Sequence, residues 1–265
     1  GSVRGPASHC GLFGIRPTHG RVSLAGCHDL APSLDTGGFF AREGATFLRV
    51  AALVLGPDPG ALPARVRPLL AADAFGLLDD AAAAAFAPAL ARVEAHLGPA
   101  EGRVAAAGGF EPLYRAFRVI QGYEAWIVDG PLIERYHPPL GPGVLDRFDY
   151  ARTVTQAQWR EAEDVRRSFR AALRDLVGDD GVLVLPTMPD VAPLLTEGDE
   201  ALNDYRMRAL NLLCLSVLSG LPQVSMPLAT RLGAPLGLSL LGPPGSDLGL
   251  VRLAVAIAAD GRVPA

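Results

Sequence analysis

The second half of the chain alternates between helical and extended patterns of hydrophobic residues. Thr155 and Gln158 have the spacing of a capping box, and Gly178 is a suitable stop for the amphipathic helix that they open. Residues 181–185 form an uninterrupted apolar run, which is typical of a strand covered on both faces. Residues 202–218 are apolar almost all round, so we expect a buried helix there.

Two further strands and a last helix are predicted after Gly220, which is expected to end the buried helix. The strands lie at residues 224–226 and 236–241. Ser246 is expected to cap the last helix, and Gly261 to stop it. This order of strands and helices predicts an α/β fold, in which a mixed β-sheet core is flanked by helices.

Shorter elements are predicted in the first half of the chain. Residues 13–17 and 21–24 read as extended segments joined by turns, and residues 45–55 as a short helix. Residues 74–97 and 113–136 carry the apolar spacing of helices.

We therefore divide residues 1–265, taken as one partial domain, into three consecutive segments. Residues 1–56 are rich in Gly and Pro and contain short apolar pieces. Residues 57–140 are rich in Ala and are expected to form a helical insertion or lid. Residues 141–265 form the C-terminal α/β part.

Composition excludes several functional classes. The chain has 265 residues, a formal net charge of −4 and 49% hydrophobic residues, which is ordinary for a globular protein. No apolar run reaches the roughly 18 residues of a membrane span, and the acidic balance argues against nucleic-acid binding. All 24 basic residues are Arg. The absence of Lys excludes a phosphate-binding loop of the Lys type and a Schiff base on the chain's own Lys.

The three cysteines, Cys10, Cys27 and Cys214, indicate a reducing compartment. Their number is odd and they lack Cys-x-x-Cys spacing, so we expect no disulfide framework and a cytoplasmic location. His9 beside Cys10 and His28 beside Cys27 allow a zinc site as an alternative. Buried free cysteines are common, and we therefore predict no metal.

Ser2 is the leading candidate for chemistry. A serine beside glycine can be approached closely by a substrate, and neighbouring backbone N–H groups can face a developing oxyanion. Taken alone, the pair Gly1-Ser2 is a weak signal, because such pairs are common in loops. It is not part of a Gly-x-Ser-x-Gly elbow either, since Arg4 occupies the last glycine position.

The pattern around Ser2 extends far beyond this pair. Residues 1–23, GSVRGPASHCGLFGIRPTHGRVS, resemble the amidase signature family. The likeness covers both ends of the chain, whereas residues 57–140 are much less diagnostic. It continues in short segments at residues 30–36, 40–42, 181–189, 220–228, 238–242 and 245–247. Residues 35–42 are most similar to indole-3-acetamide hydrolases and related small-amide amidases.

The resemblance implies a catalytic site of which this chain holds one part. Family members carry a Ser, cis-Ser, Lys triad on a mixed sheet flanked by helices. The nucleophile of that triad falls on Ser2, and Gly1 is the remaining glycine of the oxyanion hole. The cis-Ser and the Lys lie upstream of this block. We therefore expect that the N-terminal part of the fold is missing, that the chain alone is inactive, and that no cofactor is needed.

The likeness also suggests roles for residues near the site. Thr187, Met188 and Pro189 follow a strand and are candidates for the substrate pocket, because loops at strand ends commonly form sites. Arg4 either pairs with an Asp that the family has before its glycines, or lies on the surface. The sequence departs from the family pattern at four positions, Gly5, His9, Gly37 and Phe39.

The function implied by the resemblance is the hydrolysis of a small carboxamide to carboxylate and ammonia through a serine acyl-enzyme. The expected partner is the small-molecule amide, without nucleic acid or membrane, and a homodimer is one option for the assembly. One alternative is a glutamine-hydrolysing subunit of the amidotransferase type, which needs protein partners. Another is a non-catalytic fragment or pseudoenzyme.

A different base is a further alternative. Without an upstream Lys, Ser2 would have to recruit His9, His19 or His28, with Asp35 as the orienting group of a conventional triad. Arg cannot take this role, because its side chain stays protonated.

Overall fold

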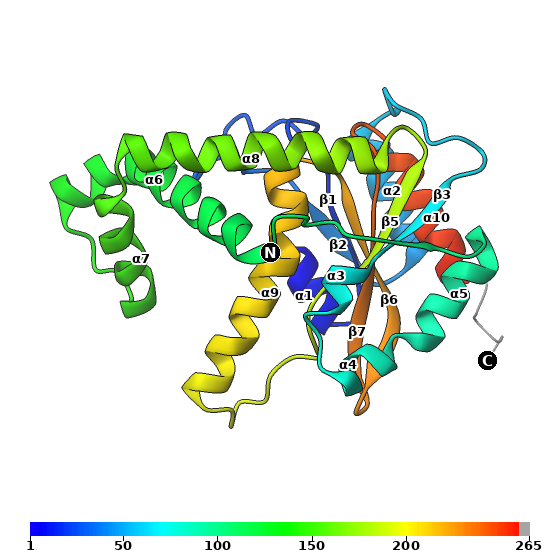
Figure 1. Ribbon diagram of the computed structural model, residues 1–265. Coiled ribbons are helices and arrows are strands. Elements are labelled where there is room, and N and C mark those ends of the chain that lie inside the picture. Colours follow the sequence, from blue (N-terminus) through cyan, green and yellow to red (C-terminus); the bar gives the residue numbers. More distant parts are fainter. Residues whose placement is uncertain (260–265) are drawn as a thin grey trace.

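A seven-stranded sheet forms the centre of the computed structural model, which describes residues 1–259 (Figure 1). Its strands are β1 (Phe13–Arg16), β2 (Phe39–Ala41), β3 (Arg67–Ala71), β4 (Glu101–Arg103), β5 (Gly181–Pro186), β6 (Gln223–Arg231) and β7 (Ala234–Leu241). Their order across the sheet is β2-β1-β6-β7-β5-β3-β4. β3 runs parallel to β4 and β5, and the other neighbouring pairs are antiparallel, so the sheet is mixed.

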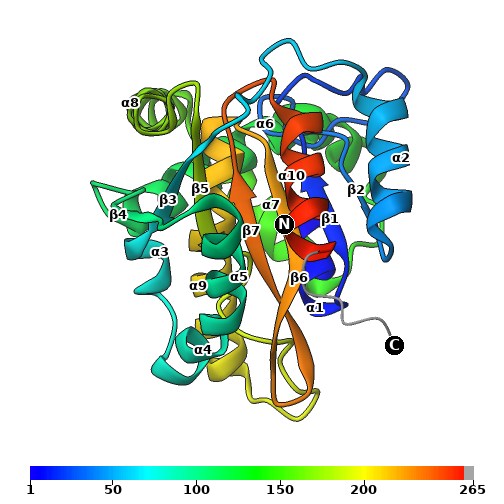
Figure 2. The ribbon, with the colours of Figure 1, turned by 90° about the vertical axis from the view of Figure 1, so that its right-hand side faces the viewer.

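Helices cover both faces of this sheet. They are α1 (Arg4–His9), α2 (Gly44–Leu55), α3 (Ala72–Phe75), α4 (Asp80–Ala85), α5 (Ala87–Leu97), α6 (Phe110–Tyr136), α7 (Pro142–Thr153), α8 (Gln156–Val177), α9 (Asp199–Ser219) and α10 (Asp247–Ala259). One apolar core joins the sheet to α6, α8 and α9, and a second joins it to α2, α5 and α10. Figure 2 shows α10 in front of the sheet and α9 behind it. The predicted fold class, a mixed sheet flanked by helices, is confirmed.

β5 shows how the sheet is buried from both sides. Leu183 and Leu185 belong to the core beneath α6, α8 and α9, whereas Val182 and Val184 belong to the core beneath α2, α5 and α10. This division follows from the two-residue period of a strand. All four side chains are fully buried, and each contributes about 1.5–3 kcal/mol of hydrophobic stabilisation. The predicted strand at residues 181–185, covered on both faces, is confirmed.

The helix boundaries predicted in the second half are also confirmed. Thr155 opens α8 with a capping box, and Gly178 ends it. Gly220 ends α9 with a φ of 72°, a conformation that glycine adopts without strain. The burial predicted for residues 202–218 applies only from Ala209 onward. The earlier turns of α9 lie largely at the surface, because charged side chains interrupt the apolar pattern there.

Residues 57–140, expected to form a helical insertion or lid, contain strands as well as helices. This segment also supplies β3, which pairs with β5 on one side and with β4 on the other. The predicted helix at 74–97 is divided among α3, α4 and α5, while 113–136 lies within α6. Residues 21–24 form bends and irregular backbone rather than a strand. Within residues 1–259, no helix combines the length and the apolar character needed to cross a bilayer.

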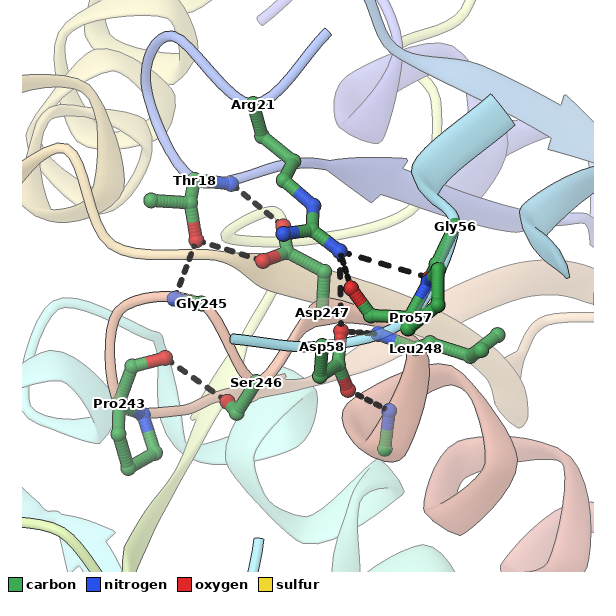
Figure 3. A network of polar contacts seen from close by, with 11 residues as sticks. Thr18, Arg21, Gly56, Pro57, Asp58, Pro243, Gly245, Ser246, Asp247 and Leu248 are labelled. Atoms are coloured by element: carbon green, nitrogen blue, oxygen red, sulfur yellow. Dashed lines mark hydrogen bonds and ion pairs between the residues drawn. The ribbon is translucent and has the colours of Figure 1, made fainter. Parts of the chain in front are cut away.

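The last helix receives its cap from a distant part of the chain (Figure 3). Asp58 accepts hydrogen bonds from the backbone N–H groups of Leu248 at 2.9 Å and Gly249 at 2.7 Å. The hydroxyl of Ser246 instead donates to the carbonyl of Pro243. The prediction of Ser246 as the cap is therefore wrong, because a carboxylate from the loop after α2 satisfies the free N–H groups. The predicted stop of this helix, at residue 261, lies outside the described residues.

The first residue of α10 fixes the segment that follows β1. Asp247 accepts hydrogen bonds from the backbone N–H and the hydroxyl of Thr18, at 2.6 and 2.7 Å. Arg21 lies 3.6 Å from the carboxylate of Asp58 in the same network (Figure 3). Three distant segments of the chain are thus joined at the start of α10.

Candidate functional site

Ser2 lies in the turn that leads into α1. The backbone N–H of Gly5 donates to the carbonyl of Gly1 at 3.0 Å, which closes the turn around Ser2. Gly1 and Ser2 are both exposed, and the Ser2 hydroxyl has no hydrogen-bond partner within residues 1–259. The hydroxyl is therefore accessible to a substrate and to a base from outside the described part of the chain.

α1 packs directly on the sheet because two glycines leave room for it. A side-chain carbon added at Gly14 on β1 would lie 2.6 Å from Cβ of Ala7, and one at Gly237 on β7 would lie 3.0 Å from Cβ of Ser8. The hydroxyl of Ser8 also accepts the backbone N–H of Gly237 at 2.8 Å. Since both added carbons would be closer than ordinary contact distance, any larger residue would lift α1 and move Ser2.

Arg4 anchors the start of α1 in the interior. Its side chain is 1% exposed, and its guanidinium donates to Oε1 of Gln223 on β6 and, at 3.1 Å, to the carbonyl of Leu213 on α9. Burial and the nearby charge of Arg16 lower the pKa of Arg4 to about 9. A surface position for Arg4 is therefore wrong, and the side chain ties the turn of Ser2 to two elements of the core.

The three pocket candidates, Thr187, Met188 and Pro189, follow β5 and are all buried. Oγ1 of Thr187 lies 2.8 Å from Oγ of Ser225 on β6 and 2.7 Å from Oγ of Ser239 on β7. These three hydroxyls satisfy one another inside the sheet, as buried polar groups require. Thr187 therefore joins three strands and supports the site from within.

Met188 lies beside Gly5, whose backbone N–H closes the turn of Ser2. A side-chain carbon added at Gly5 would lie 3.4 Å from the sulfur of Met188, and one added at Gly1 would lie 2.8 Å from Cδ1 of Leu213. Met188, Ala209 and Leu213 form a small apolar cluster separate from the two cores of the sheet. Sequence reasoning missed Leu213, because its only signal was the general apolar pattern of α9.

The alternative triad with a histidine is not assembled. Within the described residues, the Ser2 hydroxyl bonds none of the three candidates, His9, His19 and His28. Nε2 of His9 lies 2.5 Å from the Tyr205 hydroxyl instead. The carboxylate of Asp35, the proposed orienting group, accepts the backbone N–H groups of Leu30 and Ala31 at 2.8 and 2.9 Å. Asp35 thus stabilises its own loop.

The zinc site considered as an alternative is not formed by the described residues. No three or more of their His, Cys, Asp or Glu side chains lie close enough together to hold a metal ion. Cys10 and Cys27 are exposed free thiols, and Cys214 is a buried one. Burial raises the pKa of Cys214 to about 12, which keeps its thiol protonated.

Two adjoining hollows lie beside α10, on the opposite face of the sheet from α9. Both are lined in part by Leu62, Gly249 and Arg252. Neither includes the turn of Ser2, so they are not the site that the sequence predicts.

Comparisons with known proteins place the chain in a family. The family model described as Amidase matches residues 1–76 and 136–251. Amidase 1 of Arabidopsis thaliana is 32% identical over 98% of this chain and 68% of its own length. A glutamyl-tRNA(Gln) amidotransferase component from Thermus thermophilus is 29% identical over 97% of this chain and 62% of its own length.

The fold is shared with a solved structure of an amidase, which superposes with a TM-score of 0.84 at 24% sequence identity. That superposition covers 98% of this chain and 61% of the solved one. The chain thus spans between 61% and 68% of the length of these relatives. Given the match to the family model and the identity with Amidase 1, the chain belongs to the amidase family.

Proposed function

We propose that the whole protein containing this chain hydrolyses a small carboxamide to a carboxylate and ammonia, with Ser2 as the nucleophile. The observation that carries this proposal is the exposed hydroxyl of Ser2, which has no hydrogen-bond partner among residues 1–259 and lies in a turn closed by the Gly5–Gly1 hydrogen bond. Buried Arg4 fixes this turn to the core. Membership of the amidase family supports the type of bond that is cleaved.

The reaction proceeds in two steps. Oγ of Ser2 attacks the amide carbon as its proton passes to a base, and the C–N bond then breaks. The leaving nitrogen takes up a proton and departs as ammonia, which leaves an acyl ester on Ser2. Water attacks this ester, the carboxylate leaves, and the hydroxyl is restored. The backbone N–H groups of Gly1 and Ser2 are proposed to stabilise the oxyanion in both steps.

Proton transfer is assigned to a Lys and a cis-Ser that the family resemblance places before residue 1. Burial can lower the pKa of a Lys enough for it to act as a base. Arg stays protonated, and all 24 basic residues of this chain are Arg. No cofactor takes part in the proposed steps.

The relative from Thermus thermophilus supports a second candidate, a glutamine-hydrolysing component of an amidotransferase. Such a component would use the same Ser2 chemistry on glutamine and would depend on partner proteins. A non-catalytic protein that only binds amides is the third candidate. The substrate and the need for a partner distinguish the three.

Ammonia release by the whole protein tests the proposal. The substrates are aryl-acetamides, short aliphatic amides and glutamine, each offered without a partner protein. Ser2→Ala should abolish the activity, whereas Ser168→Ala, which alters an exposed serine on α8, should leave it unchanged. Activity that survives in Ser2→Ala would refute the assignment of the nucleophile. Hydrolysis of glutamine and of no other amide, and only when partner proteins are added, would favour the amidotransferase type.

The location and the assembly of the protein remain predictions. We propose a cytosolic location because Cys10, Cys27 and Cys214 are all free thiols. A homodimer is proposed as one assembly. Cell fractionation and light scattering of the whole protein test these two points.

A further inference from the structure

A hollow of about 470 Å³ lies between α5 and α10, against the segment that leads into β3. We call it the α5–α10 hollow, and its lining includes Leu62, Arg65, Val66, Leu97, Arg252 and Leu253. It adjoins the other hollow, at the start of α10, with which it shares Leu62, Gly249 and Arg252. Ligand sites in proteins usually measure about 300–1,000 Å³, so the α5–α10 hollow has room for a small organic molecule.

The α5–α10 hollow and Ser2 lie on opposite faces of the sheet. Leu236 and Leu238 on β7 belong to the core beneath α2, α5 and α10. A side-chain carbon added at Gly237, between them, would point to the other face, because side chains alternate along a strand. There it would lie 3.0 Å from Cβ of Ser8 on α1. Figure 2 shows α5 and α10 on the face toward the viewer. A ligand in this hollow is therefore separated from Ser2 by the sheet.

Apolar side chains form one part of the lining. Leu62, Val66, Leu97 and Leu253 are partly buried and pack against the core beneath α2, α5 and α10. Since each of them also lines the hollow, part of its surface faces the open space. An apolar ligand that covers this surface removes it from water, which favours binding.

Two arginines supply positive charge to the same hollow. Arg65 lies in the segment before β3 and Arg252 lies on α10, and both are exposed. Neither guanidinium has a hydrogen-bond or ion-pair partner within residues 1–259. None of the described residues that line the α5–α10 hollow is acidic. A guanidinium binds a carboxylate through two parallel hydrogen bonds, so the lining favours an anion with this geometry.

The adjoining hollow is less suited to an anion. Asp58 lines it, and the Asp58 carboxylate accepts the backbone N–H groups of Leu248 and Gly249 and lies 3.6 Å from Arg21. An anion placed there would be repelled by this carboxylate. Charge therefore distinguishes the two hollows, although both are lined by Arg252.

We propose that the α5–α10 hollow is a second binding site, which takes a small organic carboxylate with an apolar body. In this site the carboxylate pairs with Arg252 and Arg65, and the apolar body covers Leu62, Leu97 and Leu253. The inference does not rest on the proposed hydrolysis at Ser2, because the site lies on the other face of the sheet. Its test measures binding and needs no activity.

The test follows the leucine methyl groups of the whole protein by NMR, after labelling with carbon-13. Phenylacetate is the probe, phenylacetamide is its uncharged counterpart, and acetate lacks the apolar body. We expect phenylacetate to shift the methyl signals of Leu253 and to saturate below about 10 mM. Phenylacetamide and acetate should each bind at least about tenfold more weakly at Leu253. The methyl signals of Leu213, which lies beside Gly1, report binding near Ser2 separately.

Three variants locate the site. Arg252→Gln should weaken binding at Leu253 by about tenfold, because the charge-assisted hydrogen bonds to the carboxylate are lost. Arg160→Gln is the matched control, since Arg160 is exposed on α8 and has no partner in the described part of the chain, and it should leave the affinity unchanged. Ala256→Leu places a larger side chain in the hollow and should weaken binding without removing a charge.

Three results would overturn the inference. The first is no saturation at Leu253 by about 10 mM phenylacetate. The second is equal affinity for phenylacetate and phenylacetamide, which would mean that charge plays no part. The third is an equal effect of Arg252→Gln and Arg160→Gln, which would mean that the anion is attracted by the overall charge and is not held in the hollow. Success or failure of amide hydrolysis at Ser2 changes none of these results.

Discussion

Arg4 places a guanidinium in the interior, two residues after the proposed nucleophile. Arg4→Ala would leave Oε1 of Gln223 and the carbonyl of Leu213 without their donor. Each unsatisfied buried group costs about 1–3 kcal/mol, so the free energy of unfolding should fall by roughly 2–5 kcal/mol. Urea unfolding of the whole protein measures this change.

Arg167 provides the matched control for Arg4, because its side chain is 77% exposed on α8. Arg167→Ala should change the free energy of unfolding by no more than about 0.5 kcal/mol. If the two variants are equally stable, Arg4 does not anchor the turn of Ser2.

The carboxyl group of Asp247 is expected to make the free energy of unfolding depend on pH. Burial raises the pKa of its carboxyl above the usual 3.8, although the hydrogen bonds from Thr18 oppose this shift. A raised folded-state pKa means that the folded protein holds the proton to a higher pH than the unfolded chain does. The stability that Asp247 gains from protonation is therefore complete below its unfolded pKa and is lost as the pH rises through the folded pKa.

The expected result is a pH-dependent difference between wild type and Asp247→Asn. The stability of wild type minus that of the variant should decrease as the pH rises from below 3.8 toward neutrality. Chemical unfolding at a series of pH values measures it. A difference that increases with pH would mean that the Thr18 hydrogen bonds outweigh burial.

At the scale of elements, local signals predicted the structure well where the pattern was strong. The capping box at Thr155, the stops at Gly178 and Gly220, and the apolar run in β5 all lie as expected. β3 was missed because Pro68 interrupts a short strand, and β4 consists of three exposed residues without an apolar pattern. These two strands form because they pair with neighbouring strands, and the local sequence of a strand does not show which strand it will pair with.

The candidate site likewise contains some residues that the sequence predicts and others that it does not. Ser2 and Gly1 were found through a contiguous motif, and Arg4 belongs to it. Leu213 and Tyr205 were missed because they lie about two hundred residues away, and only the folded chain brings α9 beside α1. Residues at such separations become predictable only from tertiary packing.

The cap of α10 is also a contact between residues far apart in the sequence. It allows a prediction of how much this cap contributes to stability. Asp58→Ala would remove the acceptor of the Leu248 and Gly249 N–H groups and the partner of Arg21. Loss of a helix cap costs about 0.5–2 kcal/mol, and the free energy of unfolding should fall by that amount. Asp175→Ala, an exposed position on α8, should have little effect. An equal effect of both changes would contradict the capping role.

At the scale of the whole molecule, the absence of Lys limits what these 265 residues can do by themselves. The Ser2 hydroxyl has no partner within residues 1–259, and His9 and His28 bond to other side chains. A serine without a base is a poor nucleophile, and Arg cannot serve as the base. Ser2, the proposed nucleophile, thus has no base bonded to it within the part of the chain that the structure describes.

We therefore expect the isolated 265-residue chain to release no ammonia from amides that the whole protein hydrolyses. Both proteins would be assayed at equal concentration, with circular dichroism to establish that the isolated chain is folded. A folded but inactive chain places the base outside these residues. Full activity of the isolated chain, abolished by Ser2→Ala, would instead require a base within it. His9 would then be the first histidine to replace, because it lies on α1, the helix that directly follows Ser2.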